Sequence, residues 1–318
     1  MSAQGPRVLL VSGKGGTGKT SVAAALALAA ARRGRSVLLL ELEGRPGAAR
    51  LLGLRSSYDE RPTALGFSIA SVGPRQALLE YLSRFYGMSR LAGPIVRARV
   101  VDTVTQVAPG FRDLMLTGKV YETAEWRRGS TRGAHLPRYD LVVADAPPTG
   151  QIAAFLQAPA AFAEIIRVGR PGRQAQRIDA FLRRRSRLHL VTTLEELPVD
   201  ETLESLAAIS ELGFPVGPVI VNRVLGPAIP RGGTSRLEEL SPERLAVLAR
   251  KAGVRIGARA ARAALEVAGH HRAAEAEQRA QLRRLRGHEL VELPMLLSAR
   301  FGAEEITELS GRVEGLVP

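Results

Sequence analysis

The stretch Gly13–Thr20, which reads GKGGTGKT, decides the fold of this 318-residue chain. A short apolar run, RVLLVS (7–12), precedes it, and a run of helix-forming residues, KTSVAAALALAAARR (19–33), follows it and stops before Gly34. A short apolar run bounded by glycine predicts a buried strand, and glycine is a common C-cap of helices. A second apolar run, SVLLLEL (36–42), completes a strand–helix–strand unit. Such a unit predicts a parallel sheet with helices packed on its faces.

The same stretch fits the pattern G-x-x-x-x-G-K-[ST] of a phosphate-binding loop, and it lies between a strand and a helix as that motif requires. Glycines let consecutive backbone amides point into one concavity, and the following helix adds its positive end. Lys19 is expected to neutralise charge on the β- and γ-phosphates, and Thr20 to bind Mg²⁺ through its hydroxyl. The expected nucleotide site is lined by Gly13, Gly15, Gly16, Thr17, Gly18, Lys19, Thr20 and Ser21.

A second marker of nucleotide chemistry is the segment DAPPTG (145–150). Asp145 ends an apolar run, so it is expected at the carboxyl edge of a central strand, where it would hold Mg²⁺ directly or through water. Two prolines follow Asp145 and argue against a simple helix-capping role. Thr149 and Gly150 are placed to present a backbone amide to a γ-phosphate. We therefore expect this segment to change position with the state of the nucleotide.

Other apolar runs complete the expected architecture. They predict strands at 139–146, 187–194, 217–222 and 288–294, with 67–72 as an additional candidate. These runs are mostly continuous rather than alternating, which is typical of strands covered on both faces. The sequence predicts an α/β fold with a doubly wound, mostly parallel sheet of the P-loop NTPase type, in one domain over residues 1–318. Three segments are expected to be helical insertions forming a subdomain: about 75–135, 151–186 and 228–287.

Composition excludes several kinds of site. The chain has no cysteine, which rules out disulfides and thiolate metal ligands, and it has only five histidines. Its net charge of +14 is compatible with an acidic partner such as a nucleic acid or a membrane surface. However, 41 of the 45 basic residues are arginine, as codon bias in a GC-rich genome would produce, so the charge also fits an ordinary solvated surface. We find no signal layout at the start, and the longest apolar stretch (22–31) is too short to span a bilayer. We expect a cytoplasmic protein, with peripheral membrane association as an option.

The motifs resemble those of a known family. KGGTGKT, with an extra lysine after the first glycine, is similar to the deviant Walker A signature of the ParA/MinD/ArsA group of dimeric ATPases. DAPPTGQIAAFL resembles switch II of the arsenite-pump ATPase ArsA and of the tail-anchored-protein targeting ATPase. Further similar segments are PGFRD (109–113), EELPVDET (195–202), VIVNR (219–223) and VELPML (291–296). Overall the chain looks most similar to short, cysteine-free ArsA-like proteins of high-GC bacteria.

The resemblance implies a dimer, either a homodimer or a heterodimer with a paralogous subunit, that binds ATP and Mg²⁺ between its subunits. Lys14 would be the signature lysine, which reaches across the interface to the partner's phosphates and acts like an arginine finger. Asn222 resembles the adenine-contacting asparagine, Arg223 beside it is assigned to the same site, and Pro294 lies in the loop that lines the adenine pocket. Glu201 lies near the dimer interface by resemblance, or it is a first-turn carboxylate that favours the helix dipole.

Two departures from the family pattern bear on activity. Glu43 takes the place of the aspartate that positions the attacking water, and an extra methylene moves its carboxylate by about 1 Å, a displacement that can slow a reaction about 10²-fold. Hydrolysis is therefore expected to be slow or weak, unless Glu41 takes this role. The absence of cysteine excludes arsenite binding through thiolates and the zinc site that closes the targeting ATPase dimer.

The expected function is a nucleotide-dependent dimeric ATPase switch whose helical insertions bind an unidentified protein client or membrane-associated partner. Apolar residues of the insertions, such as Leu78, Phe155 and Ile165, line a client groove or form an ordinary core. One alternative is a ParA/MinD-like positioning ATPase on DNA or membrane. The C-terminal segment carries no basic amphipathic helix of the membrane-anchoring kind. We expect a protein or membrane-associated partner rather than DNA. Another alternative is a non-hydrolysing regulatory subunit of a hetero-oligomer.

Overall fold

One twisted sheet organises the computed structural model, which describes residues 5–43, 47–86, 110–125, 138–226 and 240–318. Within these ranges the sheet has eight strands in the order β3-β4-β2-β5-β1-β6-β7-β8. All neighbouring pairs are parallel except β3 with β4. The strands are β1 (Val8–Gly13), β2 (Val37–Leu42), β3 (Arg61–Pro62), β4 (Ser68–Val72), β5 (Leu141–Asp145), β6 (Ser186–Thr193), β7 (Val219–Val224) and β8 (Leu290–Pro294).

The predicted fold class is confirmed. Each apolar run expected to be a strand coincides with one, with ends that differ by at most two residues. Strand β7 differs by two residues at both ends, and it extends through Arg223 to Val224 because it pairs with β8 as far as Pro294. The two-residue strand β3 was not predicted, since Arg61 and Pro62 are exposed and form no apolar pattern.

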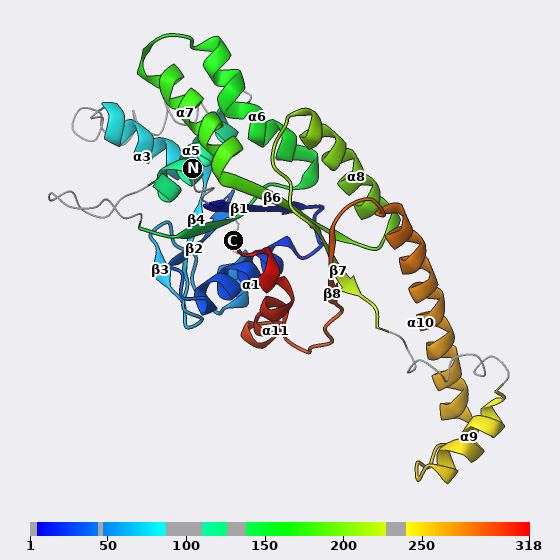
Figure 1. Cartoon of the computed structure of the whole chain (residues 1–318). Helices are drawn as coiled ribbons and strands as arrows, with labels where there is room; N and C mark the ends of the chain where they lie inside the picture. The colour runs from blue at the N-terminus through cyan, green and yellow to red at the C-terminus, as the bar shows by residue number, and fades with distance from the viewer. Residues whose placement is uncertain (1–4, 44–46, 87–109, 126–137, 227–239) are drawn as a thin grey trace.

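The described helices are α1 (Lys19–Arg32), α2 (Gly47–Leu51), α3 (Pro74–Tyr86), α5 (Phe111–Glu125), α6 (Thr149–Ile165), α7 (Gly169–Arg185), α8 (Glu196–Glu211), α9 (Pro242–Lys251), α10 (Ala258–Arg284) and α11 (Ala303–Val313). Helices cover both faces of the sheet (Figure 1). The β1 residues Val8 and Leu10 pack with α5, α6, α7 and α8, whereas Leu9 and Val11 pack with α1 and α11. Both faces of the strand are therefore buried, which explains why its sequence is continuously apolar.

Helix α1 is buried on almost all sides, from Val22 to Ala30. Its alanines allow β1, β5 and α11 to approach closely, and α11 covers it with Ile306, Leu309 and Val313. Arg32 Nη1 also donates to Ser310 Oγ over 2.9 Å. The C-terminal helix thus completes the core beside the phosphate loop. The sequence pattern did not predict this packing.

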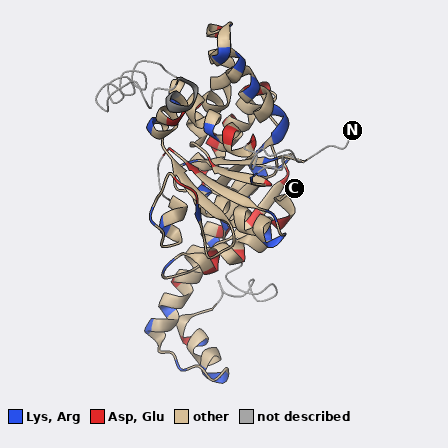
Figure 2. Ribbon diagram, turned by 90° about the vertical axis from the view of Figure 1, so that its left-hand side faces the viewer, with Lys and Arg blue, Asp and Glu red and all other residues tan. Residues whose placement is uncertain are grey.

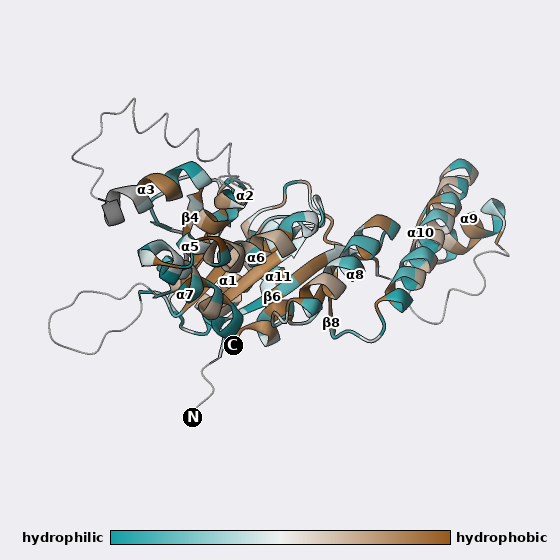
Figure 3. Ribbon diagram, turned by 90° about the horizontal axis from the view of Figure 1, so that it is seen from above, coloured by the Kyte–Doolittle hydropathy of each residue, from teal (hydrophilic) through white to brown (hydrophobic). Residues whose placement is uncertain are grey.

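The helices of the expected insertions form two groups. The described part of the first range holds α3 and α5, and the second range holds α6 and α7; α5, α6 and α7 pack on one another above the sheet (Figure 1). Residues 87–109 and 126–135 of the first range, and 228–239 of the third, lie outside the described residues. The remaining helices, α9 and α10, pack on each other and project from the body in Figures 1 and 3. Leu78 and Phe155 belong to the buried core, whereas Ile165 is exposed.

In the part of the chain that the structure describes, no helix combines the length and the apolar character needed to cross a membrane.

The packing of α11 on α1 yields a stability test. Leu309 is 2% exposed and Leu297, just before the helix, is 89% exposed. We expect Leu309→Ala to lower the free energy of unfolding by about 2–5 kcal/mol, the usual effect of a buried leucine deletion. The matched control Leu297→Ala should change it by less than about 0.5 kcal/mol. Denaturant unfolding of both variants measures this, and equal effects would contradict the role given to α11.

Candidate functional site

The loop GKGGTGKT follows β1 at the carboxyl edge of the sheet, and two of its glycines, Gly13 and Gly18, leave no room for a side chain. Gly18 has a φ of 92°, and a Cβ there would lie 2.3 Å from Asn222 Nδ2. At Gly13, a Cβ would lie 2.1 Å from the carbonyl oxygen of Val191 in β6. Glycine is required at both positions because neighbouring strands hold the loop so closely. Gly15 and Gly16 are exposed, and Ser21 is half-buried in the first turn of α1.

Asn222 holds the loop in place from the end of β7. Its Nδ2 donates to the carbonyl oxygen of Thr17 over 2.8 Å, and its Oδ1 accepts from the amide of Arg223 over 2.9 Å. Thr17 in turn donates its hydroxyl to the carbonyl of Lys14 over 2.9 Å. In this structure both ends of the Asn222 amide are thus bonded to backbone. The adenine contact implied by the resemblance stays a prediction.

The residues assigned to the adenine side are brought together at the end of β7. Arg223 has a φ of 57°, and Pro294 lies beside Val224 in the neighbouring strand β8. Gln278 of α10, which the sequence pattern did not single out, accepts from the amide of Leu225 over 2.9 Å and donates to the Arg223 carbonyl over 3.2 Å. The projecting helix α10 is therefore attached directly to this edge of the site.

The expected metal ligands Thr20 and Asp145 are in contact. The Thr20 hydroxyl donates to Asp145 Oδ2 over 2.6 Å, and the other oxygen, Oδ1, is buried without a hydrogen-bond partner in the described residues. Burial raises the pKa of Asp145 to about 6, although Thr20 and Lys19 act in the opposite direction. A buried carboxylate oxygen without a partner, beside a threonine hydroxyl and a phosphate loop, is a donor set that fits Mg²⁺.

Lys14 lies against Glu201 of its own chain. Lys14 Nζ forms an ion pair with Glu201 Oε1, and the Thr149 hydroxyl donates to Glu201 Oε2 over 2.8 Å. The bond from Lys14, followed by that from Thr149, lowers the pKa of Glu201. Glu201 therefore links the phosphate loop to the segment 145–150. The first-turn interpretation of Glu201 is wrong, because α8 begins five residues earlier, at Glu196.

Segment 145–150 is also fixed to β1. The Ser12 hydroxyl donates to the carbonyl of Pro147 over 2.6 Å, and the amide of Ala146 donates to the carbonyl of Val11 over 2.9 Å. Thr149 and Gly150 begin α6, with Thr149 buried and Gly150 exposed. The start of α6 thus lies at the same edge of the sheet as the phosphate loop.

Glu43 follows β2 in a left-handed conformation, with a φ of 71°, and its side chain is only 9% exposed. It forms an ion pair with Arg112 at the start of α5. The motif PGFRD contains Arg112, but sequence reasoning gave that arginine no role. The contact links the proposed water-positioning carboxylate to a helix of the first insertion.

Glu41 is fully buried, and its carboxylate accepts hydrogen bonds from the backbone at the start of α2. It accepts a hydrogen bond from the amide of Ala48 over 2.6 Å and another from the Ser71 hydroxyl. Burial raises its pKa above the usual value for glutamate. Because its carboxylate is bonded on both sides to the start of α2 and to β4, the geometry favours Glu43 over Glu41 as the carboxylate that faces a substrate.

The raised pKa of Asp145 predicts a pH dependence of stability. In the folded state this carboxyl has a pKa of about 6 and keeps its proton up to that pH, whereas the ordinary pKa of an aspartate is 3.8. Stability without Mg²⁺ should therefore fall as the pH rises from about 4 to 6, the window in which only the folded state holds the proton. Thermal melting of the wild type should show a steeper decline across this window than Asp145→Asn, which lacks the titrating group. Parallel curves would contradict the assignment.

Comparison with known proteins agrees with this geometry. The family model described as anion-transporting ATPase matches residues 6–181, more than half of the chain. The ATPase BagA of Mycobacterium tuberculosis is 42% identical over 226 residues, which cover 69% of this chain and 65% of that protein. The arsenical pump-driving ATPase of Acidiphilium multivorum is 26% identical over 238 residues, covering 69% of this chain and 40% of its own length. The matches thus span less than two thirds of these relatives. The phosphate loop and the Thr20–Asp145 pair lie at one edge of the sheet, within the residues that the family model matches. The chain belongs to the ArsA family of anion-transporting ATPases.

Proposed function

We propose that the chain is an ATP-hydrolysing switch that binds ATP and Mg²⁺ at the phosphate loop and closes into a dimer around them. The observation that carries this proposal is the Thr20–Asp145 pair, whose second carboxylate oxygen is buried beside that loop with no hydrogen-bond partner among the described residues. A buried charged oxygen is unfavourable unless a cation or a hydrogen-bond donor satisfies it. Family membership supports ATP hydrolysis at the level of the family.

Thr20 and Asp145 would hold Mg²⁺, the latter directly or through water. When bound, the ion would neutralise charge on the β- and γ-phosphate oxygens. Lys19, at the first residue of α1, would face the same phosphates, and the backbone amides of the glycine loop would surround them. Thr149 and Gly150 would approach the γ-phosphate from the start of α6. Asn222, Arg223 and Pro294 would accommodate the base.

Lys14 has two positions in this proposal. In the present conformation it neutralises Glu201 of its own chain, which also holds Thr149. In the dimer it would leave Glu201 and reach the phosphates bound by the other subunit. A triphosphate carries more negative charge than one carboxylate, so nucleotide favours the exchange. Release of Glu201 would also free Thr149 to approach the γ-phosphate.

Glu43 is the proposed residue that orients the attacking water. Its ion pair with Arg112 restrains it, so turnover should depend on movement of α5. This link supports the proposal that the helical insertions, which would bind a protein or membrane-associated partner, control hydrolysis. The same contact supports a second candidate, a weakly hydrolysing regulatory subunit, if Arg112 stays in place.

The dimer proposal predicts opposite effects for two substitutions. With Mg²⁺ and a non-hydrolysable ATP analogue, we expect the wild type to elute as a dimer in size-exclusion chromatography with light scattering. Lys14→Ala should remain a monomer, because the charge that bridges the subunits is lost. Glu201→Gln should dimerise at a lower nucleotide concentration, since Lys14 no longer has its intrachain partner.

Lys251→Ala is the matched control for these variants, because that lysine is exposed on α9. It should behave as the wild type does. A Lys14→Ala protein that dimerises normally would contradict the bridging role. A wild type that stays monomeric with the analogue would contradict the homodimer.

The water-orienting role of Glu43 predicts a graded series of turnover rates. Glu43→Gln should lower kcat about 10²-fold or more, the usual range for loss of a general base. Glu43→Asp should raise kcat, because the shorter side chain returns the carboxylate to the family position and aspartate tolerates a positive φ better.

Arg112→Gln should also raise kcat, since it releases Glu43, while Arg75→Gln on the exposed surface of α3 should have no effect. Steady-state phosphate release measures all four variants. Turnover by Glu43→Gln at the wild-type rate would show that another group orients the water.

A further inference from the structure

A groove of about 510 Å³ lies between α5 and α7. Four arginines line it, Arg173, Arg177, Arg184 and Arg185, against a single acid, Glu125. Figure 2 shows basic residues along the helices above the sheet. The proposed function gives this groove no role.

The groove lies away from the nucleotide site. Arg7, just before β1, donates its amide to the carbonyl of Arg185 over 2.8 Å and pairs with Glu125 at 3.6 Å. The phosphate loop follows the other end of β1, and that six-residue strand is about 20 Å long. This end of the groove is therefore at the opposite edge of the sheet from the phosphate loop.

The orientation of the arginines follows from the pattern of α7. Ala175, Ile178, Phe181 and Leu182 are buried on its inner face. Arg173 and Arg177 are one turn apart, and position 184 lies two turns further, so the three belong to one stripe of the helix. The floor of the groove includes Ala180 and Phe181, and Phe181 meets the Tyr121 ring edge-on at 5.2 Å between centroids.

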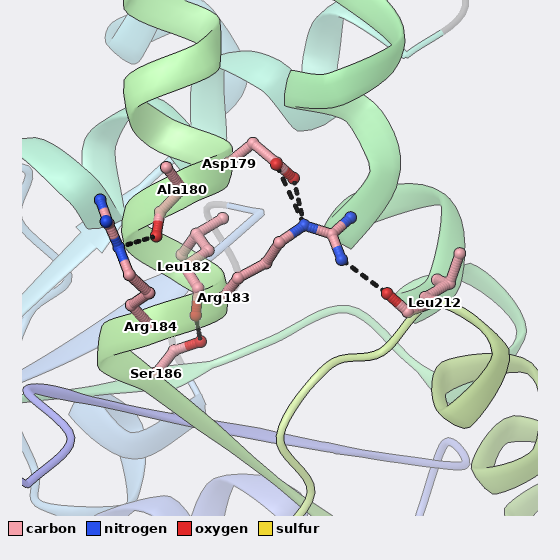
Figure 4. Close-up of polar contacts among 7 residues, drawn as sticks. All are labelled: Asp179, Ala180, Leu182, Arg183, Arg184, Ser186 and Leu212. Carbon is pink, nitrogen blue, oxygen red and sulfur yellow. Dashed lines mark hydrogen bonds and ion pairs between the residues drawn. The ribbon is translucent and has the colours of Figure 1, made fainter.

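Some arginines of α7 have structural partners. Arg183 is held by Asp179 at 3.0 Å and by the Leu212 carbonyl at 2.6 Å (Figure 4). Its guanidinium also lies over the Phe214 ring. Arg184 Nε donates to the Ala180 carbonyl over 3.1 Å. These contacts fix the C-terminal end of α7. Asp179 is the one acidic residue of this helix, and its charge is neutralised by Arg183.

Arg173 and Arg177 differ from them. Within the residues that the structure describes, neither makes a hydrogen bond or an ion pair, and the only lining acid, Glu125, pairs with Arg7. The sequence that follows Glu125, residues 126–137, contains three arginines and no acid. Two neighbouring cations without a counter-charge create a positive potential that favours an anion.

We propose that this groove binds a phosphorylated small molecule. Its phosphate would be held by the guanidinium groups of Arg173 and Arg177, whose planar donors match phosphate oxygens. Its apolar part would lie over Ala180 and Phe181, beside Tyr121. The volume lies within the range of small-molecule sites, about 300–1,000 Å³. The combination of an apolar floor and cationic walls selects an organic phosphate over the inorganic ion.

The test uses phenyl phosphate and inorganic phosphate as probes, with the full chain and its nucleotide site saturated with Mg·ADP. By titration calorimetry, phenyl phosphate should bind more tightly than inorganic phosphate. The double variant Arg173→Gln/Arg177→Gln should weaken phenyl phosphate binding at least tenfold. The matched control Arg259→Gln/Arg262→Gln removes the same charge from exposed positions of α10 and should leave binding unchanged.

Three results would overturn the proposal. Equal losses in the two double variants would indicate only a general effect of net charge. Wild-type binding in the Arg173→Gln/Arg177→Gln variant, with an unchanged melting temperature, would place the probe elsewhere. Sedimentation with phosphatidylglycerol vesicles that requires Arg173 and Arg177, without any binding of phenyl phosphate, would assign the arginines to a lipid surface.

Discussion

The hydrogen bond from Thr20 to Asp145 is the interaction on which the site depends. It joins the first turn of α1 to the end of β5, the strand between β1 and β2. The bond places a carboxylate in a buried position, where its ionised form is disfavoured without a cation. The glycine loop before Thr20 is held in turn by β6, which approaches Gly13 closely, and by Asn222, which bonds the carbonyl of Thr17. The carboxyl edge of the sheet therefore carries the features on which the proposed binding of a phosphate and a divalent cation rests.

Two ion pairs connect this edge to the surrounding helices. Glu201 joins the phosphate loop to α8 and to the start of α6, while Arg112 joins the end of β2 to α5. Each pair contains one residue at the proposed reaction centre and one on a helix outside the sheet. The Lys14–Glu201 pair is partly exposed on both sides, and such pairs contribute little to stability, so its partners can be exchanged at small free-energy cost. In the Arg112–Glu43 pair the carboxylate is nearly buried, so that contact fixes the end of β2 to α5 more firmly.

Sequence patterns predicted the sheet and the loop well because both rest on local rules. Continuous apolar runs mark strands buried on both faces, and the glycines mark a loop held against Val191 and Asn222. The same patterns missed Arg112 of α5, which pairs with Glu43, and Gln278 of α10, which bonds the backbone at Arg223 and Leu225. Of the two alternatives for Glu201, the first-turn position is wrong because α8 begins at Glu196, while a place near a dimer interface stays a prediction. In each case the partner lies far away in the chain, and its charge or amide carries no periodic signal.

By itself, the sequence determined the α/β class, the parallel strands and the phosphate loop, and it assigned Thr20 and Asp145 to one expected metal site, since apolar runs and a contiguous motif are local. Tertiary structure alone decided how the carboxylates of Glu41 and Glu43 are held. The two residues are two positions apart in the chain, yet Glu41 is bonded to the buried amide of Ala48, whereas Glu43 has a left-handed backbone and pairs with Arg112. It also decided which arginines of α7 are held within the fold, because Asp179 and the Leu212 carbonyl bind Arg183 and the Ala180 carbonyl binds Arg184. Such choices depend on long-range contacts that no window of sequence contains.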